Sequence, residues 1–263
     1  MISGFHQFEH TELCMGTVFK FQGRSSLPHG PHISAACDVL HDADRMFSTY
    51  KPESPISRLA KGETRVADED PLISQIWDEC LEWERVTDGW FSAFTPQNTF
   101  DPSGLVKTWA AQRAANVLLE AGIFDFTMNA GGDILIADDA SGELDWRIGV
   151  HQPISIAEAP DAILTVVDLK GTEFRGFATS GSAERGLHIW NPKASGKAPA
   201  EDLLQVSVVA RDIVTADVWA TAAFAEGPAC LRRLEKTDGV EAIIVLPNGE
   251  IDGTSGFAKI LAL

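Results

Sequence analysis

Two oxygen-bearing side chains late in the chain have the spacing of a metal-binding pair. Asp217 and Thr221 are four residues apart in the segment Thr215–Thr221. If this segment begins a helix, both side chains project from one face, and they offer the hard oxygen ligands that suit Mg²⁺. In a purely structural interpretation, Asp217 favours the helix dipole in the first turn and Thr221 bonds back to the helix. This segment alone favours the structural interpretation.

A second segment, Asp101–Lys107, combines a glycine-containing turn with the expected start of a helix. Helix N-termini present free N–H groups to anions, and Lys107 on the first turns can reach a phosphate or a carbonyl group. The simpler interpretation is that Asp101 or Ser103 caps the helix. In isolation, this segment also favours the simpler interpretation.

Further segments are rich in glycine, hydroxyl or histidine residues. Asn129–Asp133 places two glycines inside an expected strand, which predicts a bulge or a close backbone approach to a ligand or another strand. Thr179–Ser182 and His188–Pro192 indicate loops, and His29 and His32 are expected to be solvated rather than metal-bound. The sequence lacks nucleophile-elbow, Walker-type, His-Glu-x-x-His and Gly-x-Gly-x-x-Gly motifs.

The charge of the chain limits its partners. Among 263 residues, Lys and Arg number 21 and Asp and Glu number 38, so the formal net charge is −17 at pH 7. An acidic surface repels polyphosphates, so neither nucleic acid nor an anionic membrane is an expected partner. A phosphate-bearing ligand would need local neutralisation by backbone N–H groups or a cation, and a bound metal would provide it.

The four cysteines are widely separated and form no Cys-x-x-Cys pair: Cys14, Cys37, Cys80 and Cys230. This pattern predicts buried thiols in a reducing compartment, and it indicates neither a disulfide framework nor a zinc site. The sequence shows neither a signal peptide nor an apolar stretch near the roughly 20 residues of a membrane helix. We therefore expect a cytoplasmic protein without membrane insertion.

Hydrophobic periodicity predicts the elements that position these residues. Apolar residues at helical spacing, such as Ile33, Ala36 and Leu40, predict helices, and β-branched stretches predict strands. Helices are expected over 31–47, from Asp70-Pro71, over 103–121 before Gly122, over 215–226 and over 228–234. Strands are expected over 124–137, 146–150, 162–169, 204–210 and 240–246, with a two-residue hairpin turn at Asn248-Gly249. This mixed order favours an α+β fold with mixed or antiparallel sheets and packed helices, as one domain over 1–263.

Eight segments taken together resemble the FAD:protein FMN transferase (ApbE) family, in the family's order. They are Met15–Thr17, Phe47–Tyr50 with Ser54–Leu59, Asp88–Phe91, Asp101–Lys107, Asn129–Asp133, Thr179–Gly181, His188–Pro192 and Ala216–Thr221. The resemblance extends across most of the chain and implies an ApbE-like (T-fold-like) architecture.

The resemblance also implies a reaction and a set of site residues. Family members transfer FMN from FAD to a Thr or Ser hydroxyl of an acceptor flavoprotein and release AMP. Carried over, Mg²⁺ is held by the side chains of Asp217 and Thr221 and by the backbone carbonyls of Gly104 and Ala220. Asp217, Thr221 and Lys107 are the implied catalytic residues. Flavin dinucleotide contacts map to Met15, Tyr50, Trp90, Phe91, Ser92, Asp101, Lys107 and Trp190.

The chain departs from the family pattern in several places. The interval from Asp88 to Asp101 is short, and Ser92 and Asn191 stand where the family carries Asp. His188, which lies in a matched segment, has either a role in proton transfer or a structural role.

Three functions stay open from the sequence. They are an FMN transferase, an FAD pyrophosphatase that uses water as the acceptor, and a non-catalytic flavin-binding protein.

Overall fold

The structure is a computed structural model that describes residues 4–137, 146–157, 159, 161–181, 189–194 and 200–262. The chain forms two compact units, one of Met1–Val86 with Ser92–Ala140 and one of Thr87–Phe91 with Ser141–Leu263. Both contain helices and antiparallel strands, so the expected α+β class is confirmed. A single domain over 1–263 stays a prediction.

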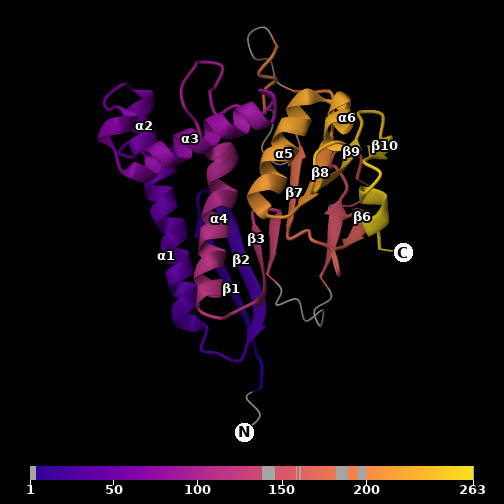
Figure 1. The fold of residues 1–263 in the computed structure, drawn as a ribbon, viewed down its shortest axis with the longest axis horizontal. Helices are drawn as coiled ribbons and strands as arrows, with labels where there is room; N and C mark the ends of the chain where they lie inside the picture. Colours follow the sequence, from indigo (N-terminus) through magenta and orange to yellow (C-terminus); the bar gives the residue numbers. More distant parts are fainter. Residues whose placement is uncertain are drawn as a thin grey trace. The chain divides into compact units, whose positions relative to one another are not determined.

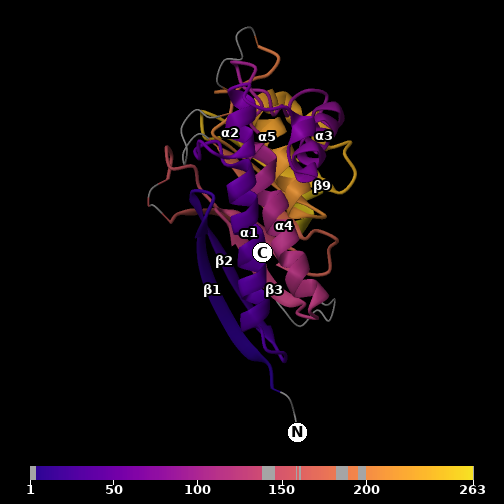
Figure 2. The ribbon, with the colours of Figure 1, turned by 90° about the vertical axis from the view of Figure 1, so that its left-hand side faces the viewer.

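The first unit contains an antiparallel meander covered by helices. Its strands are β1 (His6–Cys14), β2 (Thr17–Ser25), β3 (Asp125–Ala130) and β4 (Asp133–Ala137), paired in that order. Its helices are α1 (Gly30–Phe47), α2 (Pro55–Ala60), the short 3₁₀ helix η1 (Val66–Asp68), α3 (Pro71–Val86) and α4 (Ser103–Glu120). In Figures 1 and 2, α1 and α4 lie along β1, β2 and β3.

The core of the first unit lies between this meander and the pair α1 and α4. Phe19 and Phe21 of β2 are fully buried, as are Phe126 and Met128 of β3. These residues alternate along their strands, as expected when one face of a sheet is covered. The predicted apolar face of α1 is buried and packs against α4. The helix predicted over 103–121 is confirmed as α4, followed by Gly122 in the left-handed region (φ 81°).

Two tight hairpin turns join the strands of the first unit. Met15-Gly16 connects β1 to β2 with φ angles of 53° and 67°, and Gly131-Gly132 connects β3 to β4 with φ angles of 64° and 103°. Positive φ at both positions suits the right-handed twist of paired strands. The predicted continuous strand over 124–137 is therefore wrong, because the two glycines form a hairpin turn rather than a bulge.

Gly131 is also a point of close approach, because an added Cβ would lie 2.3 Å from Thr17 Oγ1. Rotating the Thr17 side chain relieves this clash only in part, since its Cβ does not move and would stay 3.2 Å from the new carbon. We expect Gly131→Ala to lower the free energy of unfolding by about 3 kcal/mol. Gly16→Ala is the matched control, with a similar φ and open space around it. It should cost only about 1 kcal/mol in the same urea titration, and equal losses would contradict the steric argument.

The loop before α4 is held by an aromatic cluster. Trp77 of α3 lies 5.3 Å from Phe94 and 4.5 Å from Phe100 between ring centroids. Phe94 and Phe100 also form an isolated antiparallel bridge. These contacts fix the short segment that leads into Asp101 and the start of α4.

The second unit contains four antiparallel strands that pair in sequence and a separate pair of strands. The sheet order is β7 (Gly176–Gly181), β8 (Gln205–Ala210), β9 (Val240–Val245) and β10 (Ile251–Gly253), and β5 (Arg147–His151) pairs with β6 (Ile163–Asp168). The helices are α5 (Ile213–Glu226), η2 (Pro228–Cys230), α6 (Leu231–Leu234) and η3 (Phe257–Ile260). Residues 179–181, expected to form a loop, are the end of β7.

Two local predictions in the second unit need correction. The turn around Asn248-Gly249 is longer than two residues, because Leu246 N donates to Glu250 O at 2.8 Å and Gly249 N donates to Leu246 O at 2.9 Å. The helix expected from Thr215 begins earlier, at Ile213, because the Asp212 carboxylate accepts a bond of 2.8 Å from Thr215 N and caps it. α5 then packs against β7 and β8.

The cysteine prediction is confirmed where it concerns burial. Cys14, Cys37, Cys80 and Cys230 are all buried and unbridged. In the part of the chain that the structure describes, every helix is too short or too polar to cross a bilayer.

Candidate functional site

The predicted oxygen pair lies on one face of α5. Asp217 is 6% exposed, and Thr221 follows one turn later on the same helix. Asp212 serves the N-terminus of α5, so the structural interpretation of Asp217 as a first-turn residue is wrong. Carboxylates are rarely buried this deeply unless they are paired or bind a metal.

One hydroxyl group from the adjoining strand β7 faces this side of α5. Ser180 Oγ, which is buried, lies 3.4 Å from Thr221 Oγ1. Thr179 pairs with Ser207 of β8, at 2.8 Å between their hydroxyl oxygens, on the opposite face of these strands. The second unit therefore brings the predicted segments Thr179–Gly181 and Ala216–Thr221 together through Ser180 and Thr221, whose oxygen atoms suit a hard divalent cation.

The two backbone ligands of the predicted metal set lie inside helices. Ala220 is in the middle of α5, and Gly104 is in the first turn of α4. A carbonyl oxygen has two lone pairs, so each can accept its intrahelical bond and still bind a cation. The complete set draws on both units, and its assembly stays a prediction.

Just before α4, Asp101 holds the turn that leads into the helix. Its Oδ1 atom accepts hydrogen bonds from the backbone N–H of Ser103, at 3.0 Å, and from the Ser103 hydroxyl. Its own N–H donates to the Ala93 carbonyl at 2.7 Å. The simpler interpretation, in which Asp101 or Ser103 is the N-cap, is wrong in detail, because the N-cap residue is Pro102 and has no side-chain cap. An anion at this helix end would have to compete with the Asp101 carboxylate.

Lys107 connects two of the predicted segments within the first unit. Its ammonium group forms an ion pair with Asp133, the first residue of β4 after the glycine turn. The side chains are 16% and 3% exposed, respectively. The Asp101–Lys107 and Asn129–Asp133 segments therefore meet through a buried charge pair, in which Lys107 neutralises Asp133.

In the second unit, Trp90 lies against a lysine from a distant segment. Lys193 Nζ is 4.4 Å from the Trp90 ring centroid and 3.0 Å from Asp88 Oδ2. The hydrogen bond from Lys193, with the charges of Lys193 and Arg233, lowers the pKa of Asp88. These contacts bring the Asp88–Phe91 segment next to the turn that follows Trp190. The Trp190 side chain is half-buried.

The remaining predicted flavin contacts are scattered among different environments. Tyr50 is 95% exposed, whereas Phe91 is buried, so its side chain faces the core. Met15 lies in the β1–β2 turn, and Ser92 Oγ accepts a bond of 3.2 Å from Phe94 N. His188 lies outside the described residues. Contact of these residues with a flavin stays a prediction.

A further polar cluster in the first unit was not predicted from the sequence. It involves His10, Glu12 and Cys14 of β1 and Cys37 and His41 of α1. The available signals were alternate spacing in the strand and four-residue spacing in the helix, each of which puts side chains on one face. The meeting of the two elements is a tertiary event that neither local pattern reveals.

Sequence comparison finds relatives with one shared name. The chain is 26% identical over 164 residues to the FAD:protein FMN transferase of Escherichia coli (strain K12), covering 59% of this chain and 44% of that protein. It is 30% identical over 164 residues to an FAD:protein FMN transferase of Klebsiella pneumoniae (strain 342), covering 59% and 48%. The chain thus spans about half the length of the curated relatives it matches.

Comparison with solved structures shows the same fold. The ApbE protein of Thermotoga maritima has a TM-score of 0.81 at 21% identity, covering 98% of this chain and all of that one. The flavin transferase ApbE from Vibrio cholerae has a TM-score of 0.79 at 16% identity, with the same coverage. The expected ApbE-like fold is confirmed.

The family model described as "ApbE family" matches residues 92–244, which is more than half of the chain. The match includes the start of α4 and the whole of α5, and therefore all four predicted metal ligands. Met15 and Tyr50 lie before it. From this match and the shared fold, the chain belongs to the ApbE family.

Proposed function

We propose that this protein is a Mg²⁺-dependent FAD:protein FMN transferase, which moves FMN from FAD to a Thr or Ser hydroxyl of an acceptor flavoprotein and releases AMP. The observation that carries this proposal is the buried Asp217 with Thr221 one turn later on α5, inside the family match. The names of the E. coli and K. pneumoniae relatives support the reaction. We place the reaction in the cytoplasm, in keeping with four unbridged thiols.

The donor chemistry fits the proposed ion. Asp217, Thr221 and the carbonyls of Gly104 and Ala220 would hold Mg²⁺, because all four offer hard oxygen atoms. When bound, the ion would neutralise the pyrophosphate of FAD and act as a Lewis acid. A local cation matters here because the chain has a net charge of −17 and repels polyphosphates elsewhere.

Other residues of the chain would bind and orient the dinucleotide. Tyr50 and Trp90 offer aromatic faces on which flat rings stack. Lys107 would extend its positive charge from Asp133 to a phosphate oxygen, since an ammonium group has three donors. Alignment of the acceptor hydroxyl with the phosphorus would supply the remaining rate enhancement, because catalysis of phosphoryl transfer depends mainly on positioning and charge neutralisation.

The test is a transfer assay with the full chain, FAD, Mg²⁺ and a candidate acceptor domain. We expect AMP release and a gain of one FMN mass on the acceptor, both dependent on Mg²⁺. A reaction without acceptor distinguishes the alternatives. Rapid formation of free FMN would identify a pyrophosphatase, and stoichiometric FAD binding without turnover would identify a binding protein. Either result would overturn the transferase.

The exposure of Tyr50 leads to a binding prediction. Loss of a stacked aromatic ring typically costs about 1–3 kcal/mol per base, so Tyr50→Ala should weaken FAD binding about 5- to 150-fold. Tyr50→Phe keeps the ring and should bind normally. Phe124→Ala, which removes another exposed aromatic residue of the first unit, is the control. Isothermal titration with FAD measures all three, and equal affinity of Tyr50→Ala and wild type would remove Tyr50 from the flavin site.

A further inference from the structure

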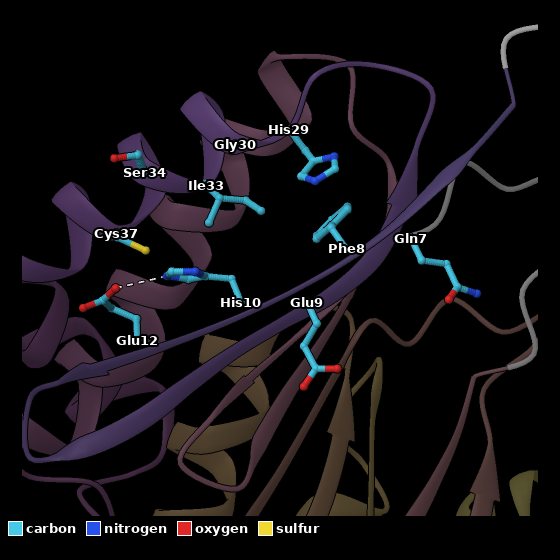
Figure 3. Close-up of a pocket in the computed structure, with 10 residues that line it drawn as sticks. All are labelled: Gln7, Phe8, Glu9, His10, Glu12, His29, Gly30, Ile33, Ser34 and Cys37. Atoms are coloured by element: carbon cyan, nitrogen blue, oxygen red, sulfur yellow. Dashed lines mark hydrogen bonds and ion pairs between the residues drawn. The ribbon is translucent and has the colours of Figure 1, made fainter.

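Three metal-ligating side chains converge between β1 and α1 in the first unit. An imidazole nitrogen of His10, a carboxylate oxygen of Glu12 and the thiol sulfur of Cys37 lie within 4.8 Å of one another. His10 and Glu12 are alternate residues on one face of β1. Figure 3 shows the three side chains directed toward one another, with Cys37 reaching from α1.

The spacing of these atoms is close to that of a zinc site. Tetrahedral Zn²⁺ has bonds of about 2.0–2.3 Å to nitrogen, oxygen and sulfur, which brings its ligand atoms to roughly 3.5 Å from one another. His10 Nε2 and Glu12 Oε2 are already 3.1 Å apart. The mixture of thiol, imidazole and carboxylate suits zinc and is poor for Mg²⁺, which prefers oxygen ligands alone.

A second layer of contacts orients the Glu12 carboxylate. His41 Nε2 lies 3.0 Å from Glu12 Oε1, so the two carboxylate oxygens have different histidine partners. Cys14 Sγ lies 3.6 Å from His41 Nδ1. His41 follows Cys37 by one turn of α1 and faces the same way. Metal sites commonly have such outer contacts, which fix the geometry of a ligand.

The cluster borders a cavity of about 490 Å³ between β1 and α1. The other end of the cavity is lined by Phe8 and His29, whose rings stack at 4.9 Å between centroids (Figure 3). His29 Nδ1 is buried and has no hydrogen-bond partner among the residues that the structure describes.

The thiols in this cluster are not poised as nucleophiles. Burial and the negative charge of Glu12 raise the pKa of Cys37 to about 12, and burial raises the pKa of Cys14 to about 11. A thiol at neutral pH in such surroundings reacts slowly. Coordination to a metal would displace the Cys37 proton and provide the compensating positive charge.

We propose that His10, Glu12 and Cys37 bind one Zn²⁺ ion, which links β1 to α1 and leaves a fourth position for water from the cavity. The spacing of the cysteines gives no indication of this site, because only Cys37 is a ligand. The other two ligands, His10 and Glu12, come from β1. The site shares no residue with the Mg²⁺ set on α4 and α5, so it is independent of the proposed transferase activity.

The experiment uses the full chain, freed of metal by dialysis against a chelator and kept in excess Mg²⁺. Titration with Zn²⁺ against a chromophoric chelator should give one tight equivalent per chain that Mg²⁺ does not displace. At about a hundred times its Kd, Zn²⁺ should raise Tm by about 5–10 °C. Co²⁺ in place of Zn²⁺ should give the intense visible bands of a tetrahedral site and a thiolate charge-transfer band.

Single substitutions assign the ligands. Cys37→Ser and Glu12→Gln should weaken Zn²⁺ binding at least about 100-fold, and His41→Ala about 10- to 100-fold through loss of orientation. Glu9→Gln, an exposed acid on the same strand, and His6→Ala, an exposed histidine of β1, should bind like wild type. If Cys37→Ser fails to fold, the Zn²⁺ affinity of Glu12→Gln and the Co²⁺ spectrum of the wild-type protein test the ligand assignment.

Three results would overturn the proposal. The first is a wild-type chain that binds no tight Zn²⁺. The second is binding that survives in Cys37→Ser and Glu12→Gln, which would place the ion elsewhere. The third is a weak, octahedral Co²⁺ spectrum without thiolate charge transfer. None of these results bears on FMN transfer, which is measured separately.

Discussion

Replacing Asp217 with asparagine is expected to lower FMN transfer by about 10²- to 10³-fold while the protein stays folded. Asparagine preserves the shape of the side chain and removes its charge. The loss of transfer activity would therefore come from weaker metal binding rather than from altered packing of α5. Lewis-acid stabilisation by a bound ion supplies several kcal/mol, and each 1.36 kcal/mol corresponds to a factor of ten in rate. The measurement is AMP release as a function of Mg²⁺ concentration.

Asp217→Asn should also require far more Mg²⁺ for half-maximal activity. Asp238→Asn is the control, because Asp238 is an exposed carboxylate of the same unit that contacts Arg211. It should retain the wild-type rate and Mg²⁺ dependence. Circular dichroism and urea denaturation of Asp217→Asn show whether the fold is intact. An intact Asp217→Asn protein with normal Mg²⁺ dependence would remove this carboxylate from the metal site.

The second large effect is expected at Lys107, and it concerns stability. Removing one partner of a buried ion pair typically costs about 3–5 kcal/mol, because the other charge is left buried and uncompensated. Lys107→Met should therefore lower the free energy of unfolding by about 3 kcal/mol. Lys107→Met combined with Asp133→Leu should recover most of that loss, because both charges are then absent. Urea denaturation of the three proteins measures the effect.

A matched control and a binding measurement separate the two roles of Lys107. Lys20 pairs with Glu9 at 3.0 Å on the exposed surface of the same unit. Lys20→Met should cost less than about 1 kcal/mol. The folded double variant should bind FAD about 10- to 150-fold more weakly, because a charged hydrogen bond contributes about 1.5–3 kcal/mol. Unchanged FAD affinity would restrict Lys107 to its structural pair with Asp133.

The sequence was most informative where periodicity is long and uninterrupted. The helices over 31–47 and 103–121 were predicted because many apolar residues recur on one face, and α1 and α4 have nearly those bounds. The oxygen pair Asp217 and Thr221 was also visible, because a four-residue spacing on a helix fixes a shared face.

Local turn chemistry was harder to interpret. The glycines of Asn129–Asp133 predict an interruption of one strand, whereas their paired positive φ angles reverse the chain there. The sequence predicts the start of α5 at Thr215, whereas the cap at Asp212 starts the helix at Ile213. The Thr, Ser and Gly types of residues 179–181 indicate a loop, but these residues form the end of β7, where β8 pairs with them.

Contacts between distant segments could not be predicted from one sequence. Lys107 and Asp133 are 26 positions apart, and Lys193 and Asp88 are 105 positions apart. No local spacing encodes such pairs, because each depends on how separate elements pack. The same reason explains why the His10, Glu12 and Cys37 cluster was missed.

The most direct test is anomalous diffraction from crystals of this protein grown with FAD and Mn²⁺, an ion that replaces Mg²⁺ and scatters anomalously. We expect one manganese peak at bonding distance from Asp217, Thr221 and the carbonyl oxygens of Gly104 and Ala220, next to the FAD pyrophosphate. A manganese ion bound to FAD but away from Asp217, or a site that excludes Gly104, would contradict this expectation.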